Sequence, residues 1–403
     1  MAEAQIASEP APLPIGRARL ALIKRLADVV CLPLTRVNGF ERAVTGDLLV
    51  EMLREAAPAD RLRTAKRLAN LSDIPNPLVR LLLRDEPEIA RPLLEDCHSL
   101  SDSDLVVCVR QAGPEHRKMI AGRRHVSEIV AEALVETLDA RAIELLLHNQ
   151  GARLSQPAVE ALVAASRHHK PYVTLLLRRP ELKPSHAYVL FWWAEPEQRR
   201  AILSRFAVSR EVLQEAAGDV FPMAAEENWQ DPLTRKALQF IERRQRNRAA
   251  LERSAYDSLE DAVAAAERGV TRELASEIAY LAGLKPMTGA KILTDPAGEP
   301  LAVLCKATGL PRDAIVSLWR GLKRPETDSE GRPVAALERA LTTYDMMAVD
   351  RAQTVLRYWG WALSSAMSPN LVQAIRSGDE QAIDEFSPPQ RAAMLALADD
   401  FRK

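Results

Sequence analysis

One short sequence motif recurs along the middle of the chain and constrains its fold more than any other feature. An apolar residue followed directly by serine occurs at Leu71-Ser72, Leu100-Ser101, Val126-Ser127, Leu154-Ser155 and Val208-Ser209. Leu182 stands in the missing place, with its serine displaced to Ser185. Successive apolar positions are 29, 26, 28, 28 and 26 residues apart. A fixed period of roughly 20–50 residues is typical of stacked-repeat proteins.

Each repeat reads as two helices joined by a short turn. The serine is the expected N-cap of the first helix, because its hydroxyl can accept a hydrogen bond from an unpaired N–H of the first turn. Within one unit, a helix follows Ser127, a turn lies near Asp139, and a second helix ends near Gly151, which could adopt a left-handed cap. Two such helices cannot bury an apolar stripe alone, so the units must stack. We therefore predict an all-α helical-repeat solenoid with no β-sheet of three or more strands.

Several of these segments resemble a known family. The stretches LLLRDEPEIARPLLEDCHSLSDSDL, KMIAGRRHVSEIV, LLLHNQGARLS, LLLRRPEL and LAVLCKATGLP are similar to the alphaproteobacterial domain-of-unknown-function family DUF2336, with its HEAT-like, leucine-rich-variant repeats. The resemblance covers roughly residues 45–320. It implies an all-helical fold and a bacterial cytoplasm, and it carries over no catalytic residues.

Changes in pattern predict the domain organisation. We expect a disordered N-terminus over residues 1–14, a basic amphipathic helix and loop over 15–42, HEAT-like repeats over 43–222, a basic connector helix over 223–254, helical hairpins over 255–325 and a C-terminal helical cap over 326–403. The last two parts form a second, smaller helical domain. The helix from Ile15 has an apolar stripe and basic flanks, so it would either pack on the solenoid or touch a membrane surface; we favour packing.

Composition limits the classes of function. The 403 residues carry a net charge of −1, which argues against a protein that coats nucleic acid. No signal peptide is expected, because no basic region precedes an apolar run at the N-terminus, and no stretch reaches the ~18 apolar residues of a membrane span. The four cysteines include no CxxC pair and do not have the even spacing of a small disulfide-bonded secreted domain. We therefore expect free thiols in a reducing compartment. We expect a cytoplasmic protein.

The sequence predicts no metal, cofactor or catalytic site. All seven histidines fall between His98 and His186, but with Cys97 and Cys108 they lack the spacing of structural zinc ligands. The common hydrolase, nucleotide-binding and metalloprotease motifs are missing. Asp102 and Asp104 sit near a helix start and read as capping carboxylates. A helical-repeat DNA glycosylase is a remote alternative that rests on fold analogy alone.

The hairpin over residues 301–321 is the strongest lookalike of a nucleic-acid site. A helix-turn-helix needs a small residue four before a turn glycine and an aliphatic residue six after it, which Cys305, Gly309 and Ile315 supply. The polar residues that would face phosphates or bases are Arg312, Ser317, Arg320, Lys323 and Arg324. Any helical hairpin with a glycine turn has the same spacing, so DNA binding is the alternative to a protein-binding role.

Phe191, Trp192 and Trp193 are the candidate partner-binding residues. In a 28-residue register, Trp192-Trp193 lies over Ala164-Ala165, where earlier units carry Glu136-Thr137 and Arg110-Gln111. Large aromatics at positions that tolerate polar residues predict a partly exposed anchor for a partner. The other interpretation is a core filler, because the Lys183-Pro184 insert permits a register that places Trp192 over Leu162.

Together these features predict a non-catalytic scaffold for protein–protein interaction, with partners and oligomeric state open.

Overall fold

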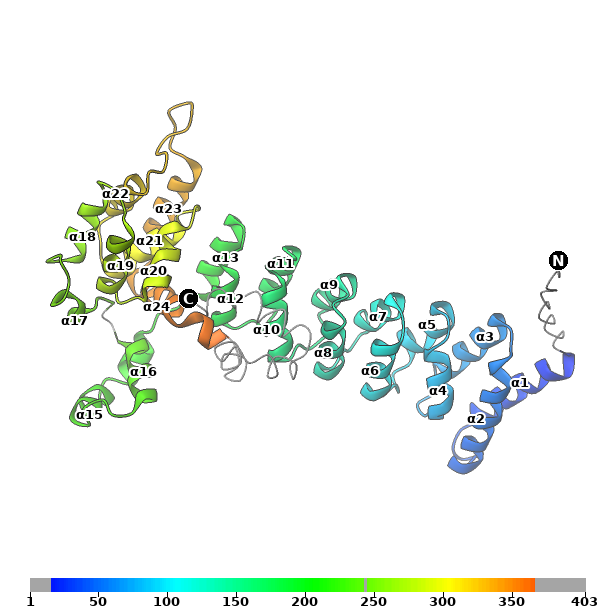
Figure 1. Cartoon of the computed structure of the whole chain (residues 1–403). Coiled ribbons are helices and arrows are strands. Elements are labelled where there is room, and N and C mark those ends of the chain that lie inside the picture. Colours follow the sequence, from blue (N-terminus) through cyan, green and yellow to red (C-terminus); the bar gives the residue numbers. More distant parts are fainter. Residues whose placement is uncertain (1–15, 243–244, 367–403) are drawn as a thin grey trace, which may run out of the picture. The chain divides into compact units, whose positions relative to one another are not determined.

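The computed structural model describes residues 16–242 and 245–366, and every regular element in this part of the chain is a helix (Figure 1). Two isolated β-bridges, Val126 with Ala152 and Thr327 with Pro333, are the extended pairings found there. The all-α prediction is confirmed. The predicted disordered N-terminus, residues 1–14, and residues 367–403 of the predicted cap lie outside the described residues.

The helices pack into two compact units that divide between Leu162 and Val163. Unit 1 holds α1 (Arg17–Val30), α2 (Gly39–Arg54), α3 (Pro58–Leu68), α4 (Asn76–Leu83), α5 (Pro87–Asp96), α6 (Asp102–Gln111), α7 (Pro114–Ala121), α8 (Glu128–Glu136) and α9 (Ala140–His148); α10 (Gln156–Ala165) crosses the boundary. The even-numbered helices α2 to α8 form one row and the odd-numbered α3 to α9 the other, each contacting the next in its row. This is the two-layered stack of a helical solenoid.

Serine side chains cap three of the predicted helix starts, whereas Ser185 lies inside a helix and Ser209 is not the N-cap of the helix that follows it. Ser101 Oγ accepts from Asp104 N at 3.2 Å, Ser127 Oγ from Val130 N at 3.4 Å and Ser155 Oγ from Ala158 N at 3.3 Å. The predicted cap at Ser72 is wrong, because α4 begins four residues later, at Asn76, and has no side-chain cap. There Pro77 lies at the start of the helix and supplies the helical φ angle instead.

Hydrogen bonds from one repeat to the preceding one give the 26–29-residue period a physical form. Asn149 Nδ2 donates to the carbonyls of Ala121 (2.8 Å) and Arg123 (2.7 Å), which lie 28 and 26 residues earlier. Ser99 Oγ likewise donates to Leu71 O, 28 residues earlier. Side chains in the turns thus bind carbonyl groups of the neighbouring repeat.

Gly151 does not form the predicted left-handed cap. It is needed because the backbone of the preceding repeat passes closely: a Cβ at Gly151 would lie 1.9 Å from the carbonyl oxygen of Arg124. The approach lets Val126 N donate to Gly151 O at 3.3 Å.

The basic first helix packs on the solenoid, as favoured from the sequence. Ile23, Ala27 and Val30 of α1 are buried, and α1 contacts α2 and α3. The loop that follows is shorter than expected, because Asn38 and Glu41 form a capping box that starts α2 at Gly39.

Unit 2 begins with further hairpins and ends in a helical cluster. Its helices are α11 (Pro171–Arg178), α12 (Pro184–Leu190), α13 (Pro196–Phe206), α14 (Glu211–Ala216), α15 (Val220–Glu226), α16 (Pro232–Ile241), α17 (Arg248–Leu251), α18 (Leu259–Ala266), α19 (Arg272–Leu281), α20 (Pro286–Thr294), α21 (Glu299–Thr308), α22 (Asp313–Gly321), α23 (Ala335–Met346) and α24 (Val349–Ala366). The predicted helix at Asp231-Pro232 is α16, capped by Asp231.

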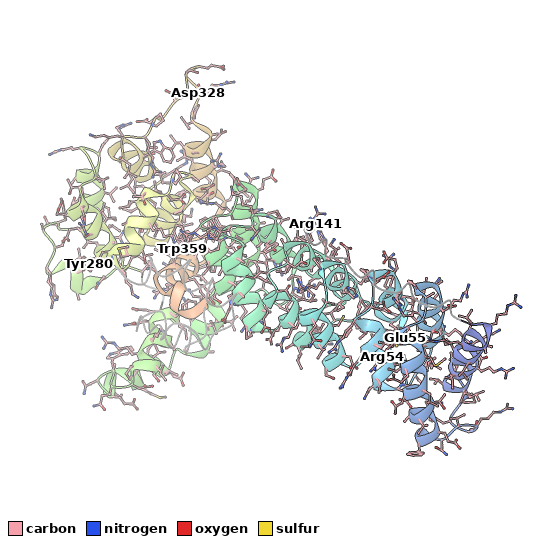
Figure 2. The ribbon with its side chains drawn as sticks, turned by 45° about the vertical axis from the view of Figure 1, so that its right-hand side comes forward. Arg54, Glu55, Arg141, Tyr280, Asp328 and Trp359 are labelled. Atoms are coloured by element: carbon pink, nitrogen blue, oxygen red, sulfur yellow. The ribbon has the colours of Figure 1, made fainter. Side chains whose placement is uncertain are left out.

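Helix α21 forms the centre of the cluster. All of its residues except Lys306 are buried, and it contacts α20, α22, α23 and α24. Helix α24 packs on α21 and also on α12. Gly309 ends α21 at φ +76° and Gly283 has φ +72°, which confirms the two predicted glycine turns. The loop between α22 and α23 carries Asp328 at its tip (Figure 2).

Candidate functional site: an arginine-lined pocket

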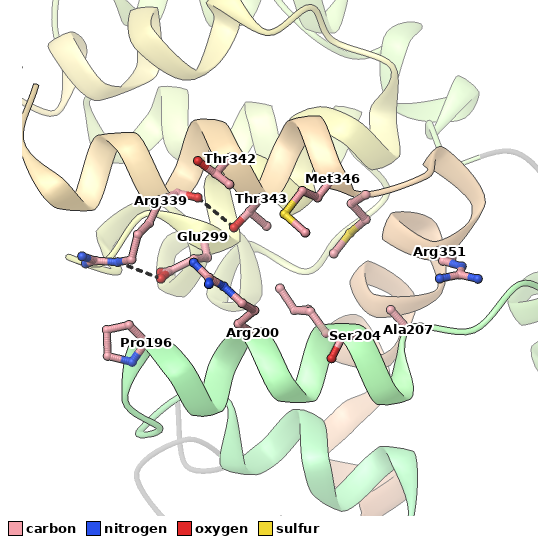
Figure 3. Close-up of a pocket in the computed structure, with 12 residues that line it drawn as sticks. Pro196, Arg200, Ser204, Ala207, Glu299, Arg339, Thr342, Thr343, Met346 and Arg351 are labelled. Atoms are coloured by element: carbon pink, nitrogen blue, oxygen red, sulfur yellow. Dashed lines mark hydrogen bonds and ion pairs between the residues drawn. The ribbon is translucent and has the colours of Figure 1, made fainter.

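A pocket of about 260 Å³ lies between helices of unit 2. Helix α13 supplies one wall, α23 the opposite wall, and α21 and α24 contribute one residue each (Figure 3). Its lining residues are Pro196, Arg200, Leu203, Ser204, Ala207, Glu299, Arg339, Thr342, Thr343, Met346, Met347 and Arg351. We call this site the arginine pocket.

A buried ion network lies beside the arginine pocket and includes its lining residue Glu299. The guanidinium of Arg199 lies 2.9 and 3.0 Å from the two carboxylate oxygens of Asp295 and 3.2 Å from Oε2 of Glu299. All three side chains are at most 7% exposed. Burial lowers the pKa of Arg199, but hydrogen bonds and charge from Asp295 and Glu299 outweigh it, so the pKa lies above its ordinary value. The network holds α13 against the start of α21.

The pocket carries surplus positive charge. Arg339 Nε lies 3.4 Å from Oε1 of Glu299, so two guanidinium groups, those of Arg199 and Arg339, balance the two carboxylates of the network. Arg200 and Arg351 are exposed and form no ion pair with any described residue. Because guanidinium groups bind carboxylates and phosphates in a fixed, bidentate geometry, the pocket favours an anionic ligand.

The surplus charges stand at opposite ends of an apolar stretch. In Figure 3 Arg200 lies with Arg339 and Glu299 at one end and Arg351 at the other, with Met346 between. Met346 is 75% exposed, whereas Met347 is buried and Leu203 adds its side chain from α13. Flexible methionines are common at surfaces that accept varied apolar side chains. A matching ligand would therefore carry acidic groups on both sides of an apolar one.

The hydroxyl groups of the pocket donate to carbonyl groups of their own helices. Ser204 Oγ donates to Ala201 O at 3.1 Å, Thr342 Oγ1 to Glu338 O at 2.8 Å and Thr343 Oγ1 to Arg339 O at 2.8 Å. A nucleophilic hydroxyl needs a base within hydrogen-bond reach. The lining carboxylate, Glu299, is instead held by two arginines.

A second pocket, of about 540 Å³, lies in unit 1 between α1 and α3. Two of its cations already have partners, because Arg63 pairs with Asp60 at 3.0 Å and Arg67 pairs with Asp28. Its remaining charges, Lys24 and Lys66, are flexible ammonium groups that hold an anion less specifically than arginine does. The arginine pocket is the better defined of the two sites.

The predicted aromatic site is packed more tightly than a free surface. Phe191 is fully buried, which removes it from any exposed partner-binding surface. Trp192 and Trp193 are partly exposed, but they lie in a turn after α12, not on a helix face, because their N–H groups bond to Val189 O and Leu190 O.

Both indoles have partners within unit 2. The Trp192 ring lies 5.0 Å from that of Trp359, which is buried and labelled in Figure 2, and Lys291 Nζ stands 4.7 Å from its centroid. Trp193 Nε1 donates to Ser166 Oγ at 2.9 Å. These contacts favour a role in packing α12 against α20 and α24.

The cations of the predicted helix-turn-helix are mostly engaged by the protein itself. Arg312 pairs with Asp345 at 3.2 Å, and Arg320 pairs with Glu326 at 2.8 Å and with Glu267. Arg324 donates to Leu293 O at 2.7 Å. Phosphates would have to displace these acidic partners.

The other two predicted DNA contacts differ in position. Lys323 is exposed, with φ +54°, in the turn after α22, whereas Ser317 is partly buried. The geometry of the hairpin itself is as predicted: Cys305 and Ile315 are fully buried on either side of the Gly309 turn. Any helical hairpin with a glycine turn packs two such residues in the same way.

Among the described residues no group of three or more histidine, cysteine, aspartate or glutamate side chains could hold a metal ion. The cysteines are free, and Cys97, Cys108 and Cys305 are buried. Within residues 16–242 and 245–366, no helix combines the length and the apolar character that crossing a bilayer requires.

The residues that make the arginine pocket were missed from the sequence. Arg200, Arg339 and Arg351 come from three helices, and no local motif links them. Each residue is an arginine on the face of a helix, and such arginines are common on protein surfaces, so the sequence gives no distinctive signal for the site.

Comparison with known proteins identifies the family. No curated protein and no solved structure matches the chain. A family model described as "Uncharacterised protein conserved in bacteria (DUF2336)" matches residues 89–357, about two thirds of the chain. The match spans the stacked hairpins from α5 onward and most of the helices around the arginine pocket, including Arg200, Arg339 and Arg351. The chain therefore belongs to the DUF2336 family.

Proposed function

We propose that this chain is a non-catalytic scaffold of the bacterial cytoplasm that binds a protein partner through the arginine pocket. The observation that carries the proposal is the pair of unpaired guanidinium groups, Arg200 and Arg351, at the two ends of an apolar floor. The ligand that matches is a peptide segment with two acidic residues on either side of one or two apolar residues.

Rigidity of the site supports this proposal. The bidentate pair between Arg199 and Asp295 fixes α13 relative to α21, so the pocket is formed before a ligand arrives. A preformed site loses little conformational entropy on binding. The stacked hairpins add the extended surfaces that helical-repeat proteins use to hold partners.

A labelled acidic peptide tests the proposal. Fluorescence anisotropy would follow a peptide that contains Glu-Leu-Leu-Gln-Glu, and a matched peptide with glutamine in place of each glutamate. We expect the wild-type chain to bind the acidic peptide, and the double variant Arg200→Glu, Arg351→Glu to bind it at least about tenfold more weakly, which corresponds to ~1.4 kcal/mol.

Arg268→Glu is the matched control, because Arg268 is an exposed arginine of unit 2 outside the pocket. It should bind the peptide as the wild type does. Equal affinity of the wild type and the pocket variant, or equal affinity for the acidic and the glutamine peptides, would contradict the proposed function.

A further inference from the structure

The segment from Glu211 to Thr234 has an unusual charge pattern. Its 24 residues contain six carboxylates and no lysine or arginine. These residues are Glu211, Glu215, Asp219, Glu226, Glu227 and Asp231, and all six are exposed. None of them forms an ion pair with a described residue; Asp231 alone caps a helix, accepting from Leu233 N and Thr234 N. We call residues 211–241, which form α14, α15 and α16, the acidic projection.

The acidic projection also exposes large apolar side chains. Val212 and Leu233 are each 77% exposed, Met223 is 52% exposed and Leu213 is 48% exposed. Each of its three helices buries at most one residue. In Figure 1, α15 and α16 extend away from the other helices of unit 2. A chain gains nothing from displaying such apolar area unless another surface covers it.

The base of the projection is clamped to α24. Arg210, which is 1% exposed, donates to Phe240 O at 2.6 Å, to Glu242 O at 3.0 Å and to Gln353 Oε1 at 2.9 Å. Arg357 donates to Glu242 O at 3.0 Å. Guanidinium groups at the carboxyl end of α16 satisfy its last carbonyls and suit its dipole. The clamp fixes the base of the projection, and none of the projection's described carboxylates forms an ion pair with Arg200 or Arg351 of the same chain.

The start of the acidic projection is complementary in charge and apolar character to the arginine pocket. At its start, Glu211 and Glu215 flank the exposed pair Val212-Leu213, which is the acidic–apolar–acidic order that matches Arg200, the methionine floor and Arg351. Complementary potentials of this kind steer association and fix its register. Both surfaces belong to one chain, and the structure shows no ion pair between their described residues.

We propose that the acidic projection of one copy docks in the arginine pocket of a second copy, so that the chain forms a reciprocal dimer. This inference rests on the proposed function, because it names the segment that the pocket receives. A two-fold dimer makes the contact twice, once in each direction, which doubles the area buried by a small pocket.

Charge reversal on each surface tests the dimer. The pocket variant is Arg200→Glu with Arg351→Glu, and the projection variant is Glu211→Arg with Glu215→Arg. Sedimentation velocity at about 100 µM chain detects an equilibrium with a Kd up to that value. We expect the wild type to sediment with about twice the mass of one chain, and each variant alone to sediment as a monomer.

Mixing the two variants is the decisive arm. In the mixture, the intact projection of the pocket variant meets the intact pocket of the projection variant, and the two reversed surfaces also match each other. Dimers should therefore reappear at a one-to-one ratio. The control variant Arg141→Glu, Arg268→Glu changes the net charge by the same amount as the pocket variant, but at exposed arginines outside the pocket. It should dimerise like the wild type.

The outcomes separate this inference from the proposed function. A wild-type chain that binds the acidic peptide but stays monomeric at about 100 µM leaves the proposed function in place and overturns the dimer. Variants that dimerise like the wild type, or a mixture that stays monomeric, also overturn it. In a further outcome, the wild-type chain fails to bind the peptide while the mixture of the two variants forms dimers. That result would support the docking of the projection and refute the binding of short acidic segments.

Discussion

The guanidinium group of Arg199 donates to both carboxylate oxygens of Asp295, a residue 96 positions later in the chain, at 2.9 and 3.0 Å. This pair joins a helix of the stacked hairpins, α13, to the corner between α20 and α21. Removing two charges from water costs free energy, so a buried ion pair adds little to the stability of the fold. Its main effect here is to select one packing arrangement of the helices. The pair fixes α13, one wall of the arginine pocket, against the start of α21, which carries the lining residue Glu299.

Removing Arg199 should therefore be severe. Arg199→Met leaves Asp295 buried without its ion-pair partner and Glu299 paired with Arg339 alone, and we expect a loss of about 3–5 kcal/mol in the free energy of unfolding. Urea unfolding followed by circular dichroism measures it. The triple variant Arg199→Met, Asp295→Asn, Glu299→Gln removes all three charges together and should recover much of the loss. A single variant that unfolds at the wild-type urea concentration would contradict the role of the network.

The serine caps of the repeats are individually testable. Ser101→Ala and Ser127→Ala each remove a side-chain acceptor for an N–H of the first helical turn. Each should lower the stability of the chain by about 1 kcal/mol. Ser72→Ala is the control, since Ser72 is exposed and caps no helix, and its unfolding midpoint should not move. Equal midpoints for all three variants would refute the capping interpretation.

Trp192 distinguishes packing from partner binding. Its ring contacts those of Phe191 and Trp359. Truncation to alanine in Trp192→Ala should therefore cost about 3 kcal/mol of stability, as for other packed aromatic side chains. Phe40→Ala, at a phenylalanine that is 80% exposed, should cost little. If thermal unfolding of Trp192→Ala matches that of the wild type, the indole is free to serve a partner instead.

Buried thiols predict how stability depends on pH. Burial raises the pKa of Cys108 to about 11 and that of Cys305 to about 12, above the ordinary value of 9.0. The folded chain keeps these thiols protonated, while the unfolded chain loses their protons near pH 9, so stability is full below that pH and falls as the pH rises toward 11–12. Urea midpoints at pH 8 and pH 10.5 should show the fall, and Cys305→Ala should reduce it. A midpoint that does not fall between these two pH values would contradict the burial of the thiols.

Local signals made the fold predictable. A capping serine, an apolar stripe at helical spacing and a turn glycine each act within a few residues, so Ser127, Ser155 and Gly309 could be read directly from the chain. The errors came where a neighbouring repeat decides the structure. Gly151 is required by the backbone at Arg124, 27 residues away, and not by its own helix end.

The candidate site was not predictable in the same way. Arg200 and Arg351 are 151 residues apart, and only the packing of α13, α23 and α24 brings them to one pocket. The aromatic pair was placed on a helix face, but α12 ends at Leu190 and the next residues form a turn. By contrast, the run without cations from Glu211 to Thr234 is visible in the sequence, although its significance depends on the exposure of Val212 and Leu233.

The most direct test of the account is whether an acidic ligand reaches the floor of the arginine pocket. Methyl NMR of the chain labelled at its methionine methyl groups, with the acidic Glu-Leu-Leu-Gln-Glu peptide added, reports on Met346 and Met347 in the pocket and on Met52 and Met119 in unit 1. The account predicts that the peptide shifts the resonances of Met346 and Met347 and leaves those of Met52 and Met119 unchanged. Unmoved Met346 and Met347 resonances at saturating peptide would contradict it.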